Sequence, residues 1–289
     1  MATRTARTLV VGATGHVGGA LVRRLAAGRG GVTVRAMVRT PGSADLPDGV
    51  ELVRGDLTDL DSLRAALRGI DRAFLVWPLG GGELARAVVD LIAARVQRIV
   101  YLSAIGVRDD GAPAPDPILQ FHTDIEQAVR AADVEWTLLR SGGMATNTLG
   151  WAQQVRERST VSWVHGDGGR ALVHEADLAE VAEIALLTDR LLGAAPEVTG
   201  PAVLTQREQA SAIGNAVGRT VTWNELPAQE VRETLVSGGW PETTADGLVA
   251  AWASMVDRPE VPTPDFETIT GTTGRTFEQW AVDHAADFR

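Results

Sequence analysis

The stretch VVGATGHVGGALVRRL, residues 10–25, decides the fold. An apolar run leads into Gly12, Gly15 and Gly18, and an amphipathic run follows these glycines directly. Glycines at this spacing, between a strand and a helix, let the chain turn sharply and present backbone N–H groups to a pyrophosphate at the helix N-terminus. The sequence therefore predicts a dinucleotide-binding turn; the alternative is a glycine turn that holds no ligand. In a binding turn, Gly12 serves the bend, Gly15 the approach of the phosphate and Gly18 the packing of the helix.

Outward from this turn, short β-branched runs alternate with longer amphipathic runs. The runs expected as strands are 8–13, 32–39, 50–56, 72–78, 98–105 and 135–141, and the runs expected as helices are 16–28, 60–69, 83–96 and 121–133. Apolar strands that alternate with helices indicate a parallel sheet with helices on both faces. The fold class is therefore expected to be α/β, with a doubly wound parallel Rossmann sheet.

The alternation breaks past residue 150. Residues 171–187 predict one more strand and helix, whereas the rest mixes Pro and Gly with helical runs at 206–218 and 244–256. We expect a smaller mixed C-terminal lobe on the substrate side. The expected boundaries are 1–150 for the dinucleotide-binding Rossmann domain, with 171–192 returning to it, and 151–170 with 193–289 for the lobe.

Composition excludes several classes of function. The chain has 289 residues, of which 45% are hydrophobic, and its formal net charge of -10 argues against nucleic acid as a partner. The 27 positions counted as lysine or arginine are all arginine, so a lysine Schiff base is excluded, and the absence of cysteine removes disulfides and thiolate nucleophiles. With no apolar run of membrane-spanning length and no signal-peptide pattern, we expect a cytoplasmic protein without a membrane partner. No oligomeric state is predicted.

The second expected strand ends at Arg39, where NAD binders usually place a carboxylate that accepts hydrogen bonds from the ribose 2′-hydroxyl. An arginine can instead make a bidentate contact with a 2′-phosphate. NADP(H) is therefore favoured over NAD(H). The alternative is that Arg39 is a solvated strand end.

Asp56 follows the third expected strand, at the height where an adenine amino group would lie. Thr58 and Asp61 are three residues apart and predict a capping box for the helix over 60–69. With that helix end satisfied, Asp56 is expected to bind the adenine. The alternative is that Asp56 caps the turn locally.

Six motifs, spread over nearly the whole chain, are similar to one family. They are GATGHVG at 12–18, RGDLTD at 54–59, HTDIE at 122–126, WTLLRSGGMATN at 136–147, VHEADLAEVA at 173–182 and TGTTGRTFEQW at 270–280. Together they resemble the NmrA-like branch of the atypical short-chain dehydrogenases. That family includes quinone and aromatic-ether reductases as well as redox-sensing regulators without catalysis.

A set of residues near the carboxyl ends of the expected strands forms the expected cofactor site. These residues are Gly12, Thr14, Gly15, His16, Val17, Gly18, Arg39, Asp56, Leu57, Trp77, Pro78, Ser103, Ser141, Gly142 and Gly143. Trp77 either walls the nicotinamide pocket or simply packs. Residues 141–143 stand where the family usually has proline-glycine, so the shape of the nicotinamide cradle stays open.

The resemblance also bears on PILQFHTDIEQ, residues 117–127. In extended short-chain dehydrogenases a catalytic YxxxK motif lies on this helix, and a glutamate follows its lysine by four residues. If Glu126 sets the register, His122 takes the place of the lysine and Ile118 that of the tyrosine. Tyr101, the only tyrosine, lies within the fifth expected strand and is expected to be a sheet residue with a satisfied hydroxyl.

Ser103 and His122 are the candidate catalytic residues. Ser103 matches the family's serine and is expected to hydrogen-bond a substrate oxygen or the carboxamide, or else to cap a turn. His122 would act as an acid or bind ribose, or else is a packed residue. A conjugated or quinone-like acceptor carries the developing charge itself, so an NADP(H)-dependent oxidoreductase on such a small molecule is favoured. A non-catalytic NAD(P) sensor and a non-redox cyclase or isomerase stay open.

The remaining polar and aromatic candidates lie in the second half of the chain. The loop 109–117, Met144, Asn147, Trp151 and Trp163 are candidates for a fairly apolar substrate cleft. Metal-ligand residue types occur at His165, Asp167, His174, Glu175 and Asp177, but their spacing straddles a strand-to-helix turn and no metal site is expected. Asp177 is expected to cap the helix 178–187, and Arg140 to be structural.

Overall fold

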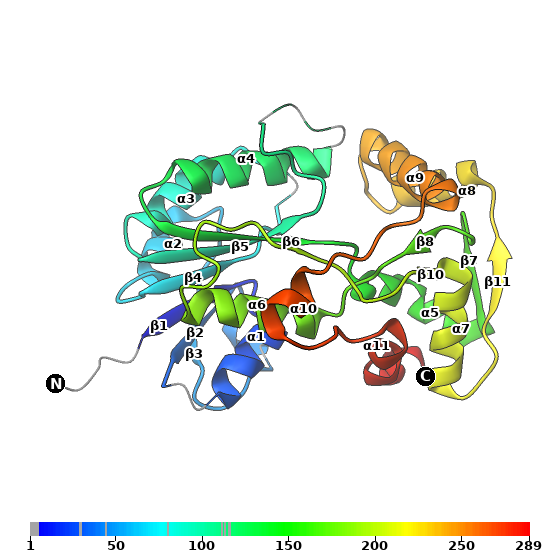
Figure 1. Cartoon of the computed structure of the whole chain (residues 1–289), viewed down its shortest axis with the longest axis horizontal. Helices are drawn as coiled ribbons and strands as arrows, with labels where there is room; N and C mark the ends of the chain where they lie inside the picture. Colours follow the sequence, from blue (N-terminus) through cyan, green and yellow to red (C-terminus); the bar gives the residue numbers. More distant parts are fainter. Residues whose placement is uncertain are drawn as a thin grey trace. The chain divides into compact units, whose positions relative to one another are not determined.

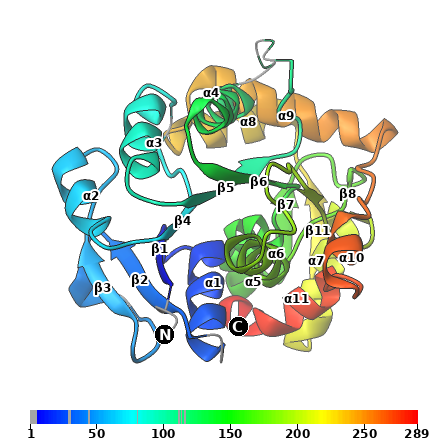
Figure 2. The ribbon, with the colours of Figure 1, turned by 60° about the vertical axis from the view of Figure 1, so that its left-hand side comes forward.

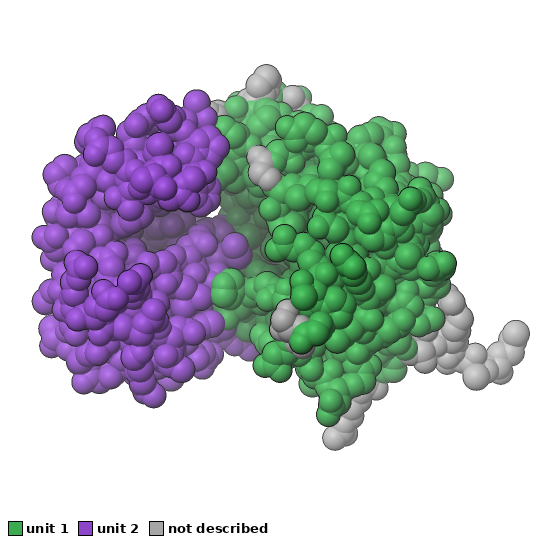
Figure 3. All heavy atoms as spheres, turned by 180° about the vertical axis from the view of Figure 1, so that it is seen from behind, with its two compact units in different colours: residues 1–141, 175–197 green, residues 142–174, 198–289 purple. Residues whose placement is uncertain are grey.

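The computed structural model describes residues 6–28, 31–43, 45–79, 81–110, 112, 114 and 117–289, without the side chain of Ser43. Part of the loop 109–117 predicted to contact substrate lies outside these residues. The chain divides into two compact units, which Figure 3 distinguishes by colour: unit 1 is 1–141 with 175–197, and unit 2 is 142–174 with 198–289. The sequence predicts breaks at 150, 170 and 192, against 141, 174 and 197 in this division.

In the described part of unit 1, seven parallel strands form a sheet in the order β3-β2-β1-β4-β5-β6-β9. Figure 1 labels β1 to β6 of this sheet. The strands are β1 (Arg7–Val11), β2 (Thr33–Val38), β3 (Glu51–Arg54), β4 (Arg72–Leu75), β5 (Arg98–Ala104), β6 (Glu135–Ser141) and β9 (Glu197–Val198). The first six strands have the Rossmann order, with the reversal between β1 and β4, which confirms the predicted fold class.

Helices cover both faces of this sheet. They are α1 (His16–Ala27), α2 (Leu60–Ala66), α3 (Ala85–Ala93), α4 (Pro117–Ala131) and α6 (Glu175–Leu187), with a short 3-10 turn η1 (Pro41–Ser43). Figure 2 shows α2, α3 and α4 on one face and α1 and α6 on the other. Strand side chains such as Leu9 and Ile99 are fully buried between these layers, and each such burial contributes about 1.5–3 kcal/mol.

Helix α1, which follows the glycine turn, is held by α6. Arg24 of α1 donates hydrogen bonds to the carboxylates of Glu180 and Glu183 on α6. The apolar side of α1 carries Leu21 and Val22, both fully buried. The position of the glycine turn therefore depends on a helix far away in the sequence.

The end of α6 is fixed by Arg98, which is 3% exposed. Its Nη1 donates to the carbonyl oxygens of Ala185, Leu186 and Thr188 at the C-terminus of the helix. Its Nε and Nη2 donate to Glu135 of β6. A cation at this end is favourable to the helix dipole, and only a guanidinium offers donors in so many directions.

Unit 2 has small sheets and its own core. Its elements are η2 (Ala145–Trp151), α5 (Ala152–Arg158), β7 (Thr160–Trp163), β8 (Gly169–Arg170), β10 (Leu204–Thr205), α7 (Gln206–Val217), β11 (Thr222–Glu225), α8 (Ala228–Ser237), α9 (Glu242–Asp257), α10 (Asp265–Thr270), α11 (Phe277–Asp283) and η3 (Ala285–Phe288). Strand β7 pairs with β11, and β8 with β10. The core centres on Trp280 and Phe288, both fully buried.

Two expectations for residues 171–187 are wrong. The predicted strand at its start is an isolated bridge between Val173 and Met144, because the chain pairs there for one residue only. The strand that the sheet adds after β6 is β9, two residues long, and not a strand within residues 171–187. Helix α6 begins at Glu175, so Asp177 lies inside the first turn and is not the N-cap residue that the sequence predicts. No helix in the described part of the chain is long and apolar enough to cross a membrane.

Candidate active site

The glycine turn after β1 needs two of its glycines for the fold itself. Gly12 has φ +77°, a left-handed conformation, and a Cβ there would lie 2.9 Å from the Val76 Cβ. A Cβ on Gly18 would lie 2.2 Å from the carbonyl oxygen of Gly12. The backbone of the turn and the first turn of the helix therefore lie too close together for a side chain at Gly18.

Gly15 is different, because its backbone conformation does not require a glycine. It is the N-cap of α1, with φ -80° and ψ 173°, a conformation open to any residue. Among the described residues, a Cβ there would meet only the Gly12 carbonyl oxygen, at 3.3 Å. Thr14 and His16 beside it are exposed, whereas Val17 is buried. The N-cap end of α1 is thus partly exposed, and a helix N-terminus is where backbone N–H groups can receive an anion.

This contrast gives the first prediction. Gly15→Val should leave the circular dichroism spectrum intact and weaken dinucleotide binding at least tenfold. The branched side chain would take the space of the pyrophosphate and move it away from the backbone N–H groups, and each charge-assisted hydrogen bond lost in this way costs about 1.5–3 kcal/mol. Gly18→Ala is the matched variant and should destabilise the fold, because its Cβ meets the Gly12 backbone. Binding is measured by fluorescence titration of the reduced dinucleotide. Unchanged affinity in Gly15→Val would remove the turn from the site.

Arg39 and Asp56 lie where β2 and β3 end, side by side in the sheet. Arg39 is exposed and Asp56 half-buried. Hydrogen bonds from the Thr58 backbone N–H and hydroxyl lower the pKa of Asp56, and the nearby charge of Arg39 adds to this. Both Thr58 bonds go to Oδ1, at 2.8 Å.

The predicted capping box is wrong. Helix α2 has Asp59 as its N-cap, whose Oδ1 accepts from the backbone N–H groups of Asp61 and Ser62. Thr58 is instead turned toward Asp56, in the kind of local turn that a short acidic side chain favours. Through Oδ1, Asp56 therefore caps its own turn, the local role given above as the alternative to adenine binding.

The end of β4 carries Trp77 and Pro78. Trp77 is 6% exposed, packs in the main core of unit 1 and donates its indole N–H to the carbonyl oxygen of Gly81 at 2.9 Å. This favours the packing interpretation of Trp77. Pro78 beside it is exposed, and Leu57 is buried at 3% exposure.

The single tyrosine is buried beneath α4. Tyr101 of β5 has no exposed surface, and its hydroxyl lies 2.6 Å from Nδ1 of His122. Burial raises the pKa of the Tyr101 phenol well above its usual range, and the charge of Glu126 raises it further. The His122 ring also packs on Phe121, with centroids 4.4 Å apart. Ile118, at the expected tyrosine position, lies one turn before His122 on the same helix.

Ser103 lies on the same face of β5 and belongs to a buried charged cluster. Its Oγ donates to Oε1 of Glu126 at 2.7 Å. Arg140 of β6 donates from Nε to the same oxygen at 3.0 Å and from Nη2 to Oε2 at 2.8 Å. Ser103, Glu126 and Arg140 are 3%, 2% and 5% exposed. The carboxylate raises the pKa of the Arg140 guanidinium.

The cluster extends to the surface through Asp109. Its Oδ1 accepts from Nη2 of Arg140 at 2.7 Å and from Nη2 of Arg130 at 2.8 Å. The Arg130 guanidinium lies over the indole of Trp136, 4.7 Å from the ring centroid. Arg140 is therefore structural, as expected, and its role is to pair the buried carboxylate of Glu126.

Residues 141–143 connect the two units. Ser141 ends β6 and is 8% exposed. Gly142 donates its N–H to the carbonyl oxygen of Val198 at 2.8 Å. A Cβ on Gly143 would lie 2.1 Å from Nη2 of Arg170, so the guanidinium occupies the place of a side chain. The nicotinamide cradle predicted here remains a prediction.

The aromatic candidates of unit 2 pack on other indoles. Trp151 is 7% exposed and meets Trp223 edge to face at 5.7 Å, so it has little surface left for a ligand. Trp163 is half-buried and meets Trp252 at 5.5 Å. Met144 is half-buried, and Asn147 is exposed.

Two of the residues with metal-ligand side chains are engaged with other residues. Asp167 pairs with Arg207, and His174 contacts Asp283 at 3.3 Å. Within the described ranges, no three His, Asp or Glu side chains gather as a metal site would require.

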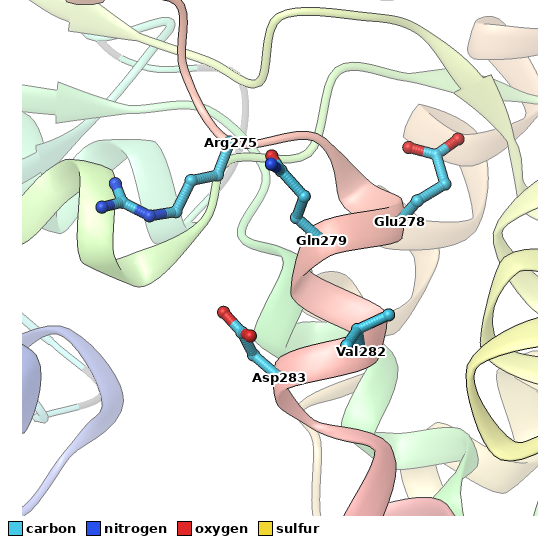
Figure 4. Close-up of a pocket in the computed structure, with 5 residues that line it drawn as sticks. All are labelled: Arg275, Glu278, Gln279, Val282 and Asp283. Carbon is cyan, nitrogen blue, oxygen red and sulfur yellow. The ribbon is translucent and has the colours of Figure 1, made fainter.

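An open pocket of about 360 Å³ lies in unit 2, along α11 (Figure 4). Its lining is Arg275, Glu278, Gln279, Val282 and Asp283. Figure 4 shows Arg275 on the segment before the helix and the other four along the helix itself. None of the residues predicted for cofactor or substrate lines this pocket.

Sequence reasoning missed the pairing of Tyr101 with His122 and of Ser103 with Glu126. A signal was present, because residues two apart on a strand share a face, and so do residues four apart on a helix. Tyr101 and Ser103 are two residues apart on the strand, and their partners His122 and Glu126 are four residues apart on the helix. The spacing alone does not show which strand residue contacts which helix residue.

Comparison with known proteins agrees with this geometry. A family model described as NAD(P)H-binding matches residues 12–189. The chain is 34% identical over 284 residues to the (4-alkanoyl-5-oxo-2,5-dihydrofuran-3-yl)methyl phosphate reductase of Streptomyces griseus subsp. griseus, covering 97% of this chain and 98% of that one. It is 31% identical over 288 residues to the NAD(P)H azoreductase of Xenophilus azovorans, with the same coverage.

A solved structure shows the same fold. The NADPH-dependent quinone oxidoreductase of Escherichia coli superposes with a TM-score of 0.76 at 23% identity, covering 96% of this chain and 98% of that one. The match of the family model over more than half of the chain, together with two relatives above 30% identity along nearly its whole length, shows that the chain belongs to the NAD(P)H-binding family.

Proposed function

We propose that the protein is an NADPH-dependent reductase that delivers a hydride to a conjugated, electron-poor small molecule without a protein phenol as acid. One observation carries this proposal: the only tyrosine of the chain, Tyr101, is fully buried and hydrogen-bonded to His122. A substrate cannot reach that hydroxyl. With no lysine in the chain, the usual acid pair is missing altogether.

The named relatives support the same class of acceptor. One reduces a dihydrofuranone that carries an alkanoyl group, and the other an azo compound. A ring alkene conjugated to carbonyl groups and an N=N bond both take up a hydride into an electron-poor π system. Such systems spread the developing negative charge, so they need little help from an acid in the transition state.

The residues present fit a dinucleotide. The N-terminus of α1 would receive the pyrophosphate, Arg39 the 2′-phosphate and Asp56 the adenine amino group. When bound, NADPH supplies the hydride. The protein's own part is to position the two reactants, which can account for a large share of a hydride-transfer rate, while water supplies the proton.

Arg39 gives the second prediction. The unmutated protein should bind NADPH about 10- to 100-fold more tightly than NADH, the range expected for hydrogen bonds between a guanidinium and a phosphate. Arg39→Ala should erase most of that difference by weakening NADPH binding alone. Arg54→Ala, at the neighbouring strand end, is the matched variant and should keep the preference. If Arg54→Ala erases it instead, the discriminating cation is on β3.

Turnover tests the proposed function directly. The absorbance of the dihydronicotinamide is followed with NADPH and a panel of quinones, enones and azo compounds. Oxidation of NADPH that depends on the protein and on the acceptor is expected for at least one of these classes. Tight NADPH binding without turnover of any acceptor would favour the sensor interpretation, and product formation that consumes no NADPH would favour a non-redox enzyme.

A further inference from the structure

The direction of one hydrogen bond in the buried cluster limits what Ser103 can do. Arg140 donates to both oxygens of Glu126, so this group is a carboxylate with no proton to give. Ser103 must therefore be the donor in its 2.7 Å bond to Oε1. A serine hydroxyl has one proton, and here that proton is committed to Glu126.

What remains on Ser103 is an acceptor. Its hydroxyl oxygen keeps lone pairs for a ligand but has no second proton to offer. To donate its proton to a ligand, Ser103 would have to break its hydrogen bond to the Glu126 carboxylate, which is 2% exposed. Loss of a hydrogen bond to a buried charge costs free energy. Asp109 and Arg130 hold Arg140, and through it the carboxylate, in place.

We propose that Glu126 is a positioning residue that fixes Ser103 as a hydrogen-bond acceptor, and that Ser103 receives the carboxamide N–H of the bound nicotinamide. This inference rests on the proposed function. Ser103 is the next-to-last residue of β5, at the carboxyl edge of the sheet where Rossmann folds hold their ligands. Ser103 therefore does not stabilise negative charge on the substrate; it orients the ring that gives the hydride.

The chemistry of the two reactants favours the carboxamide over the substrate. Quinone oxygens, azo nitrogens and conjugated carbonyl oxygens all accept hydrogen bonds and carry no donor. An acceptor serine cannot bind any of them. The carboxamide of the nicotinamide has an N–H group close to the carbon that releases the hydride, so it is the donor nearest to the reaction.

A binding cycle with a cofactor analogue tests the proposal. The acetylpyridine analogue of NADPH has a methyl group in place of the amide nitrogen and so lacks the N–H. The unmutated protein should bind it about 2- to 10-fold more weakly than NADPH, the range of one net hydrogen bond. In Ser103→Ala the two affinities should become equal. Ser211→Ala, whose exposed hydroxyl donates to a carbonyl on α7, is the control and should keep the full ratio.

The outcomes separate the inference from the proposed function. If NADPH binds and the ratio persists in Ser103→Ala, the serine does not receive the carboxamide and the inference fails alone. If Ser103→Ala weakens both dinucleotides equally, Ser103 contacts another part of the cofactor, such as a ribose hydroxyl, and the inference is again overturned. If NADPH does not bind the unmutated protein, the proposed function fails first.

Discussion

A simple ketone is expected to be reduced about 10²- to 10⁴-fold more slowly than a quinone, the rate that general-acid help usually contributes. Reduction of a ketone builds an alkoxide that must be protonated as it forms. The described site offers no phenol for this, since Tyr101 is fully buried, and Ser103 gives its proton to Glu126. A reduced quinone oxygen is a stable anion that water protonates afterwards, so the rate of quinone reduction falls much less when no acid is present.

The measurement compares kcat/KM for cyclohexanone, cyclohexenone and benzoquinone with NADPH. These acceptors share a six-membered ring and differ in conjugation, so the series follows how the rate depends on the acceptor's own ability to carry the negative charge. Cyclohexanone turnover that rivals benzoquinone would overturn the expectation. His122→Ala then identifies the donor: if ketone reduction falls with rising pH and disappears in this variant, His122 is the acid in place of the missing pair.

Removal of the Glu126 carboxylate is expected to cost about 3–5 kcal/mol of folding free energy, because it leaves the buried Arg140 guanidinium without its main partner. Glu126→Ala is measured by urea unfolding, followed by circular dichroism. Asp90→Ala is the control, because Asp90 pairs with Arg86 on the exposed side of α3, and such a surface pair is worth at most about 1 kcal/mol.

A double variant separates lost pairing from lost packing. Glu126→Leu with Arg140→Met removes both charges and keeps apolar volume, so it should cost clearly less than the two single changes added together. Additive costs would show that the cluster is held by packing alone. A Glu126→Ala loss as small as that of Asp90→Ala would contradict the buried ion pair itself.

Much of the fold could be predicted because its signals are long and regular. The strands around β1 and β5 are continuous apolar runs, and the glycine turn joins the first of them to an amphipathic helix. The errors fall where local signals compete. β9 has two residues and no pattern of its own, and Asp59 and Thr58 both had the chemistry to cap α2.

The sequence was enough to name candidate residues for the site, but not to predict the contacts between them. Ser103, His122 and the absence of a Tyr–Lys pair follow from sequence alone. Which way the Ser103 hydroxyl points depends on Glu126 and Arg140, which come from another helix and another strand. Trp151 shows the opposite case, since an aromatic residue expected at a cleft is taken up by the core of unit 2.

Unit 1 is built from two stretches of chain, and this sets an order of events during synthesis on the ribosome. The glycine turn is synthesised well before its packing partner, because Arg24 just behind it meets Glu183, 159 residues later. The excursion of 142–174 into unit 2 must be made before α6 appears. Contacts this distant form slowly and leave apolar surface open to aggregation meanwhile. The glycine turn thus becomes able to hold a ligand only after residues much later in the chain have been made.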